Sequence, residues 1–449
     1  VLGRHEAIKL SPWQILDERT ITQQGKDHKV YVPAGITVLD YMQLYKKFSF
    51  KNQESYKLDA IAHEELGVKK LDYSEYGSLH ELYVNNFERF IDYNIHDVTL
   101  IDMLEEKLKF IEQVIAFAYD ARVNYIDTMT TVRPWDIIIH NYLLDHAVVI
   151  PQFKKNSNYD TLVGGYVKEP KIGMTKWVVS CDLNSLYPHL IMQYNISPET
   201  LIRRVDNFYN IDQLLNQKLQ LEDDRYCHTA NGVLFVKNKQ GFLPSLMEKM
   251  YNERVEYKKK MISAKKELEN TPKQETEKRR KLTNEIAKYH NLQLAKKIQL
   301  NSAYGALGNE WFRWFNFNMA EAITTSGQLS IRWIEKKINH YLNALLNTNG
   351  VDYIVASDTD SIYINMEPLV KTLNTDNTKV IVDALDKFFE TKIQQVINQS
   401  YEELAKYMNA YQQKMFMKRE TIADKGIWKA KKQKQKIFNL FNNFNLINK

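Results

Sequence analysis

The sequence predicts a mixed α/β fold, in which an antiparallel sheet is combined with helices and a long helical hairpin. An apolar stretch at 177–183 runs into a turn and a helix in "WVVSCDLNSLYPHLIM". The stretch "DYIVASDTDSIYINM" at 352–366 reads as strand, turn and strand. Between them, two long helical patterns at 246–270 and 277–304 are separated by a break at Pro272.

The other elements follow from shorter patterns. "TITQQGKDHKVYV" at 20–32 predicts a hairpin that turns at Gln24-Gly25, and helical periodicity is sustained from 87 to 118. Turn-forming residues, including "GGYVKEP", mark 150–170. "GVLFVKNKQGFLPS" at 232–245 predicts a second hairpin, and helices are expected from 366 to about 411.

Length and composition are those of a globular protein. The 449 residues are enough for about two to four domains of roughly 150 residues each. The two cysteines, Cys181 and Cys227, are far apart, which indicates a reducing compartment and no disulfide framework. No run is long and apolar enough to cross a membrane, and no signal peptide is visible. We therefore expect a cytoplasmic protein without a membrane partner. The first residue, Val1, suggests a processed product or a fragment.

Positive charge is concentrated in the predicted helical hairpin. Between Lys249 and Lys297 there are fifteen Lys and Arg residues and seven Glu, in a chain whose net charge is +6. A concentrated basic segment is typical of phosphate or nucleic-acid binding. A solvated helix face rich in Lys and Glu explains the same composition, so charge alone leaves both interpretations open.

Three aspartates lie at the ends of the predicted strands. Asp358 and Asp360 occupy the turn of the strand pair at 352–366, and Asp182 ends the apolar strand at 177–183. If the two strands pair, Asp182 and Asp360 lie close together, and like charges at such a separation require a cation. Oxygen ligands favour Mg²⁺ or Mn²⁺, and two such ions suit an in-line phosphoryl displacement. The alternative is that Asp358 is a turn residue and Asp182 a helix cap.

A polar face on the predicted hairpin complements these acids. Lys297, Asn301 and Tyr304 are spaced i, i+4 and i+7, so they share one face of a helix. On the other arm, Arg254 and Lys258 are also four residues apart. Such a set of cations can hold a triphosphate. The alternative is a core tyrosine at a helix end beside solvated lysines.

The motifs themselves resemble those of a known family. "DLNSLYP", "KKIQLNSAYGALGN" and "SDTDS" are similar in sequence, order and spacing to motifs A, B and C of family B DNA polymerases. "YNIHD" at 93–97 resembles the third motif of the attached proofreading exonuclease, and "VGGYVKEP" resembles the loop between exonuclease and polymerase domains. "MKRETIADKGIWKAKK" resembles the segment that ends in the primer-binding Lys-Lys-Arg-Tyr motif. The surrounding sequence is most similar to replicative polymerases of T-even-type bacteriophages.

The resemblance implies a domain organisation. It predicts a right-hand polymerase palm with an antiparallel sheet and helical-hairpin fingers, preceded by the C-terminal part of an RNase H-like exonuclease domain. The expected parts are listed in chain order: exonuclease 1–110, a linker region 111–153, first palm segment 154–240, fingers 241–309, second palm segment 310–432, and an aberrant or disordered basic tail 433–449.

The resemblance also implies roles for individual residues. Asp182 and Asp360 bind two Mg²⁺ ions, for which Mn²⁺ can substitute, together with the backbone carbonyl of Leu183, while Asp358 has a supporting role. Residues expected to contact the incoming nucleotide are Tyr187, Arg254, Lys258, Lys297, Asn301, Tyr304 and Gly305. Tyr187 excludes a 2′-hydroxyl, and Tyr304 and Gly305 face the nascent base pair. Residues expected to contact DNA are Gly164, Gly165, Glu420, Lys431 and Lys432. Tyr93 and Asp97 are expected to be a remnant of the exonuclease site.

The sequence departs from the family pattern at both ends. Two exonuclease motifs of the family would precede the first residue, and Gln433-Lys434 stands where the family has Arg-Tyr. The last residues, "QKQKIFNLFNNFNLINK", resemble a shifted reading frame, or a genuine disordered basic tail. We therefore expect a fragment without a complete exonuclease and without a thumb.

These observations predict a template-directed DNA polymerase that uses primer-template DNA and deoxynucleoside triphosphates, located in the host cytoplasm if a phage encodes it. The alternatives are a weak or inactive DNA-binding fragment, or one piece of a split enzyme. The separate partner of a split enzyme would be an N-terminal exonuclease piece or a C-terminal thumb piece. Another two-metal nuclease or phosphatase is disfavoured, because it would not require the face of Lys297, Asn301 and Tyr304.

Overall fold

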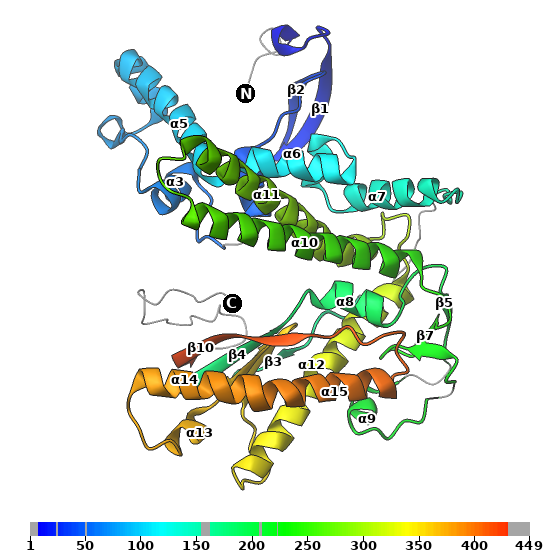
Figure 1. Ribbon diagram of the computed structural model, residues 1–449. Coiled ribbons are helices and arrows are strands. Elements are labelled where there is room, and N and C mark those ends of the chain that lie inside the picture. The colour runs from blue at the N-terminus through cyan, green and yellow to red at the C-terminus, as the bar shows by residue number, and fades with distance from the viewer. Residues whose placement is uncertain are drawn as a thin grey trace. The chain divides into compact units, whose positions relative to one another are not determined.

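The computed structural model describes residues 8–23, 26–49, 52–153, 162–205, 209–221 and 223–429. Contacts divide the chain into two compact units, which are described separately (Figure 1). Unit 1 comprises Val1–Ile150 and Glu253–Gln299, and unit 2 comprises Pro151–Asn252 and Leu300–Lys449. The functional boundaries that the resemblance implies remain predictions. None of the helices in the described ranges is long and apolar enough to cross a membrane.

Unit 1 begins with the predicted hairpin and continues with helices. Strands β1 (Leu16–Gln23) and β2 (Lys26–Pro33) pair antiparallel, which confirms the hairpin, although Gln24 and Gly25 lie outside the described residues. The following elements are α2 (Tyr41–Phe48), α3 (Leu58–Leu66), η1 (Ser74–Tyr76), α4 (Leu79–Asn85), α5 (Phe87–Leu108), α6 (Phe110–Ala121), η2 (Tyr125–Met129) and α7 (Val132–Asp145).

The helical stretch predicted from 87 to 118 is present but is divided in two. Lys109, with a φ of 55°, ends α5 in the left-handed conformation. The next helix, α6, starts at Phe110. The carboxylate of Glu105 accepts the N–H of Ile111 at 3.1 Å and so caps the first turn of α6. Periodicity alone does not reveal this break, since both helices keep an apolar face.

The long helical hairpin is confirmed. Helix α10 extends over Phe242–Asn270 and α11 over Thr276–Leu307. At the tip, the guanidinium of Arg279 donates to the carbonyl oxygens of Leu268 and Thr271, at 3.0 Å and 2.6 Å. These bonds satisfy carbonyl groups at the end of α10 that have no partner within the helix.

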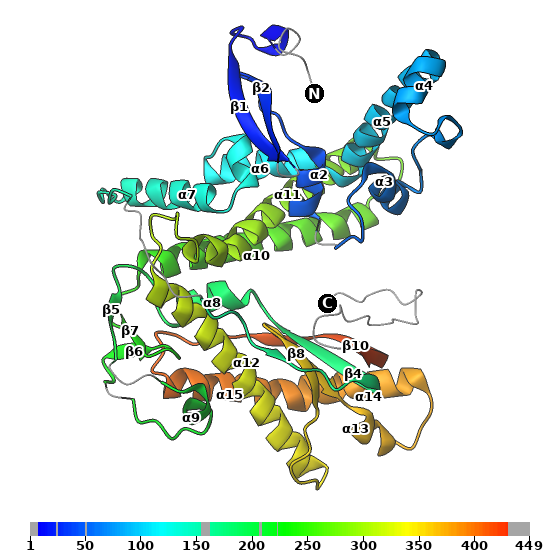
Figure 2. The ribbon, with the colours of Figure 1, turned by 180° about the vertical axis from the view of Figure 1, so that it is seen from behind.

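The centre of unit 2 is a five-stranded antiparallel sheet. Its strand order is β10-β4-β9-β8-β3, with β3 (Val167–Lys168), β4 (Gly173–Leu183), β8 (Ile354–Asp358), β9 (Ser361–Asn365) and β10 (Met417–Trp428). Helices α12 (Phe317–Leu345), α14 (Thr378–Phe388) and α15 (Gln394–Tyr407) contact these strands, as Figures 1 and 2 show from opposite sides. The mixed fold with an antiparallel sheet is therefore as predicted.

The remaining elements of unit 2 are smaller. They are α8 (Leu186–Gln193), β5 (Leu201–Arg204), α9 (Ile211–Leu215), β6 (Tyr226–His228), β7 (Val233–Val236), α13 (Glu367–Lys371) and the π-helical turn η3 (Phe389–Ile393). Strands β5, β7 and β6 form a separate three-stranded sheet in that order. Helix α8 begins directly after β4, so the predicted strand, turn and helix at 177–192 are confirmed.

The second predicted hairpin, at 232–245, is wrong. Strand β7 pairs with β5 and β6, and the chain after it enters α10 at Phe242. Gly241 does not turn the chain into a strand; its N–H donates to Oδ1 of Asn195 at 2.8 Å. A side chain at Gly241 would also meet Cβ of Ser197 at 2.6 Å, so this glycine allows close packing at the start of a helix.

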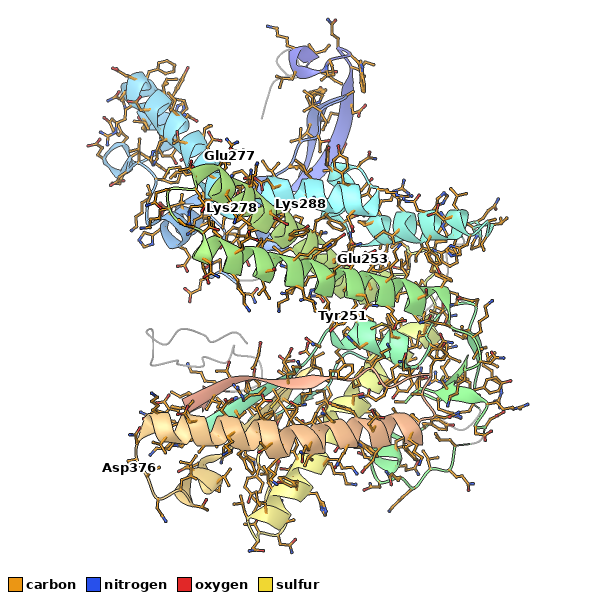
Figure 3. All side chains as sticks on the ribbon, in the orientation of Figure 1. Tyr251, Glu253, Glu277, Lys278, Lys288 and Asp376 are labelled. Carbon is orange, nitrogen blue, oxygen red and sulfur yellow. The ribbon has the colours of Figure 1, made fainter. Side chains whose placement is uncertain are left out.

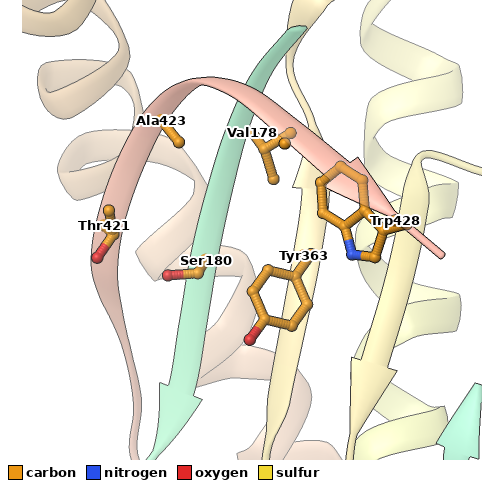
Figure 4. Close-up of a pocket in the computed structure, with 7 residues that line it drawn as sticks. Val178, Ser180, Tyr363, Thr421, Ala423 and Trp428 are labelled. Carbon is orange, nitrogen blue, oxygen red and sulfur yellow. The ribbon is translucent and has the colours of Figure 1, made fainter. Parts of the chain in front are cut away.

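One face of the sheet carries a small apolar cluster near the end of β10. Val178, Val355 and Trp428 are buried there, with Tyr363 packed against them. Figure 4 shows Val178, Tyr363 and Trp428 at this place. The cavity beside them is only about 10 Å³, room for no more than one water molecule. It is therefore a packing site and too small for a ligand. Asp182 is four residues beyond Val178 on β4, so it lies on the same face.

We expect Gly426→Ala to destabilise this sheet. A Cβ atom at Gly426 would lie 2.2 Å from the ring of Trp428, so the indole or the end of β10 must move. Overpacking of this kind costs about 1–3 kcal/mol. Urea denaturation followed by tryptophan fluorescence measures the loss. Gly164→Ala is the control, because no atom lies within 4 Å of the added methyl group. Equal midpoints for both variants would contradict the packing argument.

Candidate active site

Two adjacent strands bring Asp182 and Asp360 together. Strand β4 pairs antiparallel with β9, and Asp182 lies opposite Ser361, the residue that follows Asp360. The N–H of Leu183 donates to the carbonyl oxygen of Asp360 at 2.8 Å. The strand pairing on which their predicted proximity depends is therefore confirmed, and a backbone hydrogen bond holds the two strand ends together.

The turn between β8 and β9 contains an unusual backbone conformation. Thr359 has a φ of 48°, which β-branched residues rarely adopt. Its N–H donates to the carbonyl oxygen of Tyr166 at 2.9 Å, and its hydroxyl donates to Oδ1 of Asp358 at 3.1 Å. The turn is thus supported by the loop before β3, and the carboxylate of Asp358 is engaged within the turn itself.

The two glycines of "VGGYVKEP" lie beside this turn. A Cβ atom at Gly165 would lie 2.8 Å from Oγ1 of Thr359, so the turn and the loop can approach only because Gly165 has no side chain. The carbonyl oxygen of Gly164 accepts from Nε2 of Gln328 on α12 at 2.6 Å. Both glycines therefore have structural contacts next to the acids.

Strand β10 contributes Glu420 through a bulge. The pairing with β4 shifts between Arg419 and Thr421, so Glu420 has no partner in the register. Such a bulge changes the direction of a side chain. The guanidinium of Arg419 pairs with Asp386 on α14 and holds the strand beside the bulge. The negative charge of Glu420 acts on Asp182 and Asp360, so it belongs to the same electrostatic cluster.

Burial and mutual repulsion disfavour the charged forms of these acids. Burial, together with the negative charges of Asp360 and Glu420, raises the pKa of Asp182 to about 7. Burial also raises the pKa of Asp360, and Asp358 and Glu420 add to that effect. The site therefore concentrates negative charges that burial and repulsion disfavour. A bound cation would stabilise the charged forms of these acids.

The donor set fits a divalent cation that is shared with a substrate. Within the described ranges, no three His, Cys, Asp or Glu side chains could hold a metal ion by themselves. Mg²⁺ does not require such a set, because it is usually bound by one or two carboxylates, waters and substrate phosphates. Asp182, Asp360 and the adjacent carbonyl of Leu183 offer only oxygen donors of this kind.

Tyr187 on α8 lies against Tyr304 at the end of α11. Their ring centroids are 4.6 Å apart, with an interplanar angle of 41°. Burial raises the pKa of Tyr187 to about 12, helped by Tyr304 and the negative charges of Asp360 and Asp358. A half-buried pair of aromatic rings therefore lies within electrostatic reach of the acids.

Unit 1 carries the predicted cationic face. Burial lowers the pKa of Lys297, and the charges of Arg254 and Lys258 lower it further. The three cations therefore lie within electrostatic reach of one another. Asn301 and Tyr304 follow on α11 at i+4 and i+7 from Lys297, and Gly305 comes next. We refer to Arg254, Lys258 and Lys297 as the cationic face.

The residues predicted as an exonuclease remnant are engaged with a lysine that the motif did not include. Nζ of Lys70 lies 2.6 Å from Oδ2 of Asp97 and 4.8 Å from the ring centroid of Tyr93. Tyr93 is buried on α5. A metal ion at Asp97 would have to compete with Lys70, and a role of this pair in proofreading remains a prediction.

Two of the residues predicted to contact DNA cannot be placed. Lys431 and Lys432 lie outside the described residues. Conversely, sequence reasoning missed Tyr166, Arg419 and Lys296, which support the turn, the bulge and the hairpin. Tyr166 and Arg419 lie next to predicted residues, but only the tertiary structure reveals their contacts with Thr359 and Asp386. Lys296 is one of many lysines in its segment, and no pattern distinguishes it.

The antiparallel sheet with carboxylates at the ends of adjacent strands agrees with the palm fold of a family B DNA polymerase. Residues 135–433 match the profile of DNA polymerase family B, and the chain belongs to this family.

Individual relatives extend the comparison to almost the whole chain. The DNA-directed DNA polymerase of Escherichia phage RB69 is 34% identical over 96% of this chain and 53% of its own length. The corresponding protein of Enterobacteria phage T4 is 33% identical, with the same shares covered. The DNA polymerase of Pyrococcus glycovorans is 31% identical over 45% of this chain and 21% of its own. The chain thus spans about half the length of the curated phage relatives that it matches.

The raised pKa of Asp182 predicts a pH-dependent stability. Between its ordinary value near 3.8 and about 7, the folded protein holds a proton that the unfolded chain has released. The free energy of unfolding should therefore fall as the pH rises through this window, and level off above about 7. Asp182→Asn cannot titrate. It should raise the free energy of unfolding at pH 8 by about 1–2 kcal/mol, a value reduced for solvent screening of a partly exposed group.

Urea denaturation at pH 5 and pH 8 in the presence of a chelator measures this effect. Asp376→Asn, at an exposed carboxyl that Figure 3 labels between α13 and α14, is the matched control. It should leave the pH dependence unchanged. If Asp182→Asn and Asp376→Asn behave alike at both pH values, burial and repulsion do not disfavour the charged form of Asp182 in the folded protein.

Proposed function

We propose that this chain catalyses template-directed addition of deoxynucleotides to the 3′-end of a DNA primer. One observation carries this proposal: a family B chain holds Asp182 and Asp360 on adjacent, hydrogen-bonded strand ends, where burial and repulsion disfavour their negative charge. Such a site suits the binding of divalent cations together with a triphosphate. The names of the phage relatives support the same reaction.

Asp182 and Asp360, with the backbone carbonyl of Leu183, would hold two Mg²⁺ ions, or Mn²⁺ in their place. When bound, these cations lower the pKa of the primer 3′-hydroxyl and offset charge on the transferring phosphoryl group. Asp358 has a supporting role, since its carboxylate accepts the hydroxyl of Thr359 within the turn. Glu420 lies near the same charges and would act at the primer terminus.

The remaining residues would bind and orient the substrates. The cationic face of Arg254, Lys258 and Lys297 would hold the triphosphate with Asn301. Tyr187 would lie under the sugar and exclude a 2′-hydroxyl, while Tyr304 and Gly305 would face the new base pair. Gly164, Gly165, Lys431 and Lys432 would contact the DNA backbone, where the absence of side chains or the presence of positive charge permits close approach.

Primer extension with Mg²⁺ and deoxynucleoside triphosphates tests the proposal. Asp360→Asn should lower nucleotide incorporation by at least ~10²-fold, because the lost charge acts on the transition state. Asp182→Asn should have the same effect, and Asp358→Asn a smaller one. Asp376→Asn, which changes an exposed carboxyl away from the site, should keep the parental rate.

The outcome that contradicts the metal assignment is specific. Near-parental incorporation by Asp360→Asn or Asp182→Asn, in a protein with unchanged circular dichroism, would show that these acids do not perform the chemistry. Loss of incorporation in Asp376→Asn as well would point to a general defect of charge or folding.

Sugar selection tests the role of Tyr187. Tyr187→Ala should increase kcat/KM for a ribonucleotide relative to a deoxyribonucleotide by roughly tenfold or more, because the ring no longer fills the space beside the 2′ position. Tyr187→Phe keeps the ring and should preserve the parental ratio. A ratio that changes in Tyr187→Phe but not in Tyr187→Ala would exclude a steric mechanism.

A further inference from the structure

A buried ion cluster joins three helices of unit 1. Nζ of Lys296, on α11, lies 2.8 Å from Oδ1 of Asp120 on α6 and 2.6 Å from Oε2 of Glu253 on α10. The side chains of Lys296 and Asp120 are only 8% and 12% exposed, so this is not a solvated surface pair. Figure 3 labels Glu253 on α10, and Figures 1 and 2 both show α10 and α11 alongside α6.

Further hydrogen bonds extend this cluster along α11. Nε2 of Gln299, which is fully buried, donates to Oδ2 of Asp120 at 2.8 Å. The indole N–H of Trp135 on α7 donates to the carbonyl oxygen of Gln299 at 3.1 Å. Five residues before Lys296, the side chain of Asn291 donates to Glu112 on α6 at 3.2 Å. One face of α11 is therefore bonded to α6 and α7 at several points.

Each member of the cluster on the hairpin precedes a member of the cationic face. Glu253 is followed by Arg254 on α10, and Lys296 is followed by Lys297 on α11. Successive residues on a helix differ by about 100° in direction. An ion pair that fixes the direction of Lys296 therefore also fixes the direction of Lys297, and the same holds for Glu253 and Arg254.

The ion pairs of Lys296 form although burial disfavours the charge of Lys296 and the dipole of α6 disfavours the charge of Asp120. Burial by itself lowers the pKa of Lys296, but Asp120 and Glu253 together raise it above its usual value, so the buried side chain remains charged. Asp120 is in the last turn of α6, where the helix dipole disfavours a negative charge. Its position is therefore explained by its contact with α11 and not by the stability of α6.

We propose that Asp120, Lys296 and Glu253 are positioning residues for the cationic face, which they hold in the geometry that binds the triphosphate of an incoming nucleotide. Residues 110–145 then support the nucleotide-binding hairpin through these contacts with α11. This inference rests on the proposed function for the identity of the substrate, but the positioning itself is testable with a simple anion.

Binding of inorganic tripolyphosphate to the full chain, measured by isothermal titration calorimetry, is the first experiment. Asp120→Asn is the diagnostic variant. Removal of a negative charge near three cations would strengthen anion binding if only charge mattered. Loss of positioning would instead weaken anion binding, and we expect the affinity of Asp120→Asn for tripolyphosphate to fall at least fivefold. Lys297→Ala should show a similar loss, because it removes part of the face itself.

Two control variants separate positioning from charge and from folding. Glu267→Gln removes a negative charge that also links α10 to α11, in the exposed pair with Lys278 at 3.2 Å. It should keep the parental affinity or increase it slightly. Asp120→Glu keeps the charge and should remain within twofold of the parent. The inference is overturned if Asp120→Asn binds as tightly as the parent, if Asp120→Glu is as weak as Asp120→Asn, or if the parent shows no Lys297-dependent binding.

Primer extension with the same preparations separates this inference from the proposed function. Asp120→Asn should raise KM for the deoxynucleotide at least fivefold while kcat stays within twofold. If the parent extends primers and Asp120→Asn has the parental KM, only the positioning role is overturned. A parent that shows the expected tripolyphosphate pattern but extends no primer supports the positioning role and contradicts the proposed polymerase activity.

Discussion

The candidate active site depends on one electrostatic constraint: two half-buried carboxylates, Asp182 and Asp360, are held at neighbouring strand ends. The hydrogen bond from Leu183 to the carbonyl oxygen of Asp360 ties the ends of β4 and β9 together. Burial then makes the charged form of each acid costly, and neighbouring negative charges raise both pKa values further: those of Asp360 and Glu420 act on Asp182, and those of Asp358 and Glu420 act on Asp360. The folded chain therefore stores repulsion that a bound cation and its phosphate ligands can relieve.

The irregular features of unit 2 serve this constraint. The left-handed Thr359 closes the turn that carries Asp358 and Asp360, and Gly165 leaves room for that turn. The bulge of β10 breaks the strict alternation of side chains, which allows Glu420 to act on the same acids. Regular strands alone would not place carboxylates from a strand end, a turn and an edge strand in one electrostatic cluster.

Much of the fold could be predicted because its signals are local. Apolar strands, turn residues and helical periodicity located the central strands and the helical hairpin within a few residues. The hairpin predicted at 232–245 failed because Gly241 packs against Ser197, a contact distant in sequence. For the candidate site, the motifs predicted the acids and the cationic residues, and the structure pairs the strands that carry Asp182 and Asp360. The motifs could not identify Tyr166, Arg419 or Lys296, since these residues act through register and tertiary contacts that no single segment contains.

The ion cluster at Lys296 shows why a polar contact suits this part of unit 1. An apolar contact between α6 and α11 would tolerate small rotations and slips, because apolar packing is not directional. A lysine between two carboxylates has few acceptable arrangements, since any other rotation of α11 leaves a buried charge without a partner. Such contacts add little net stability, but they can select one register among several of similar energy. Directional selection is what a phosphate-binding face requires, because Lys297 and Arg254 must point the same way on two different helices.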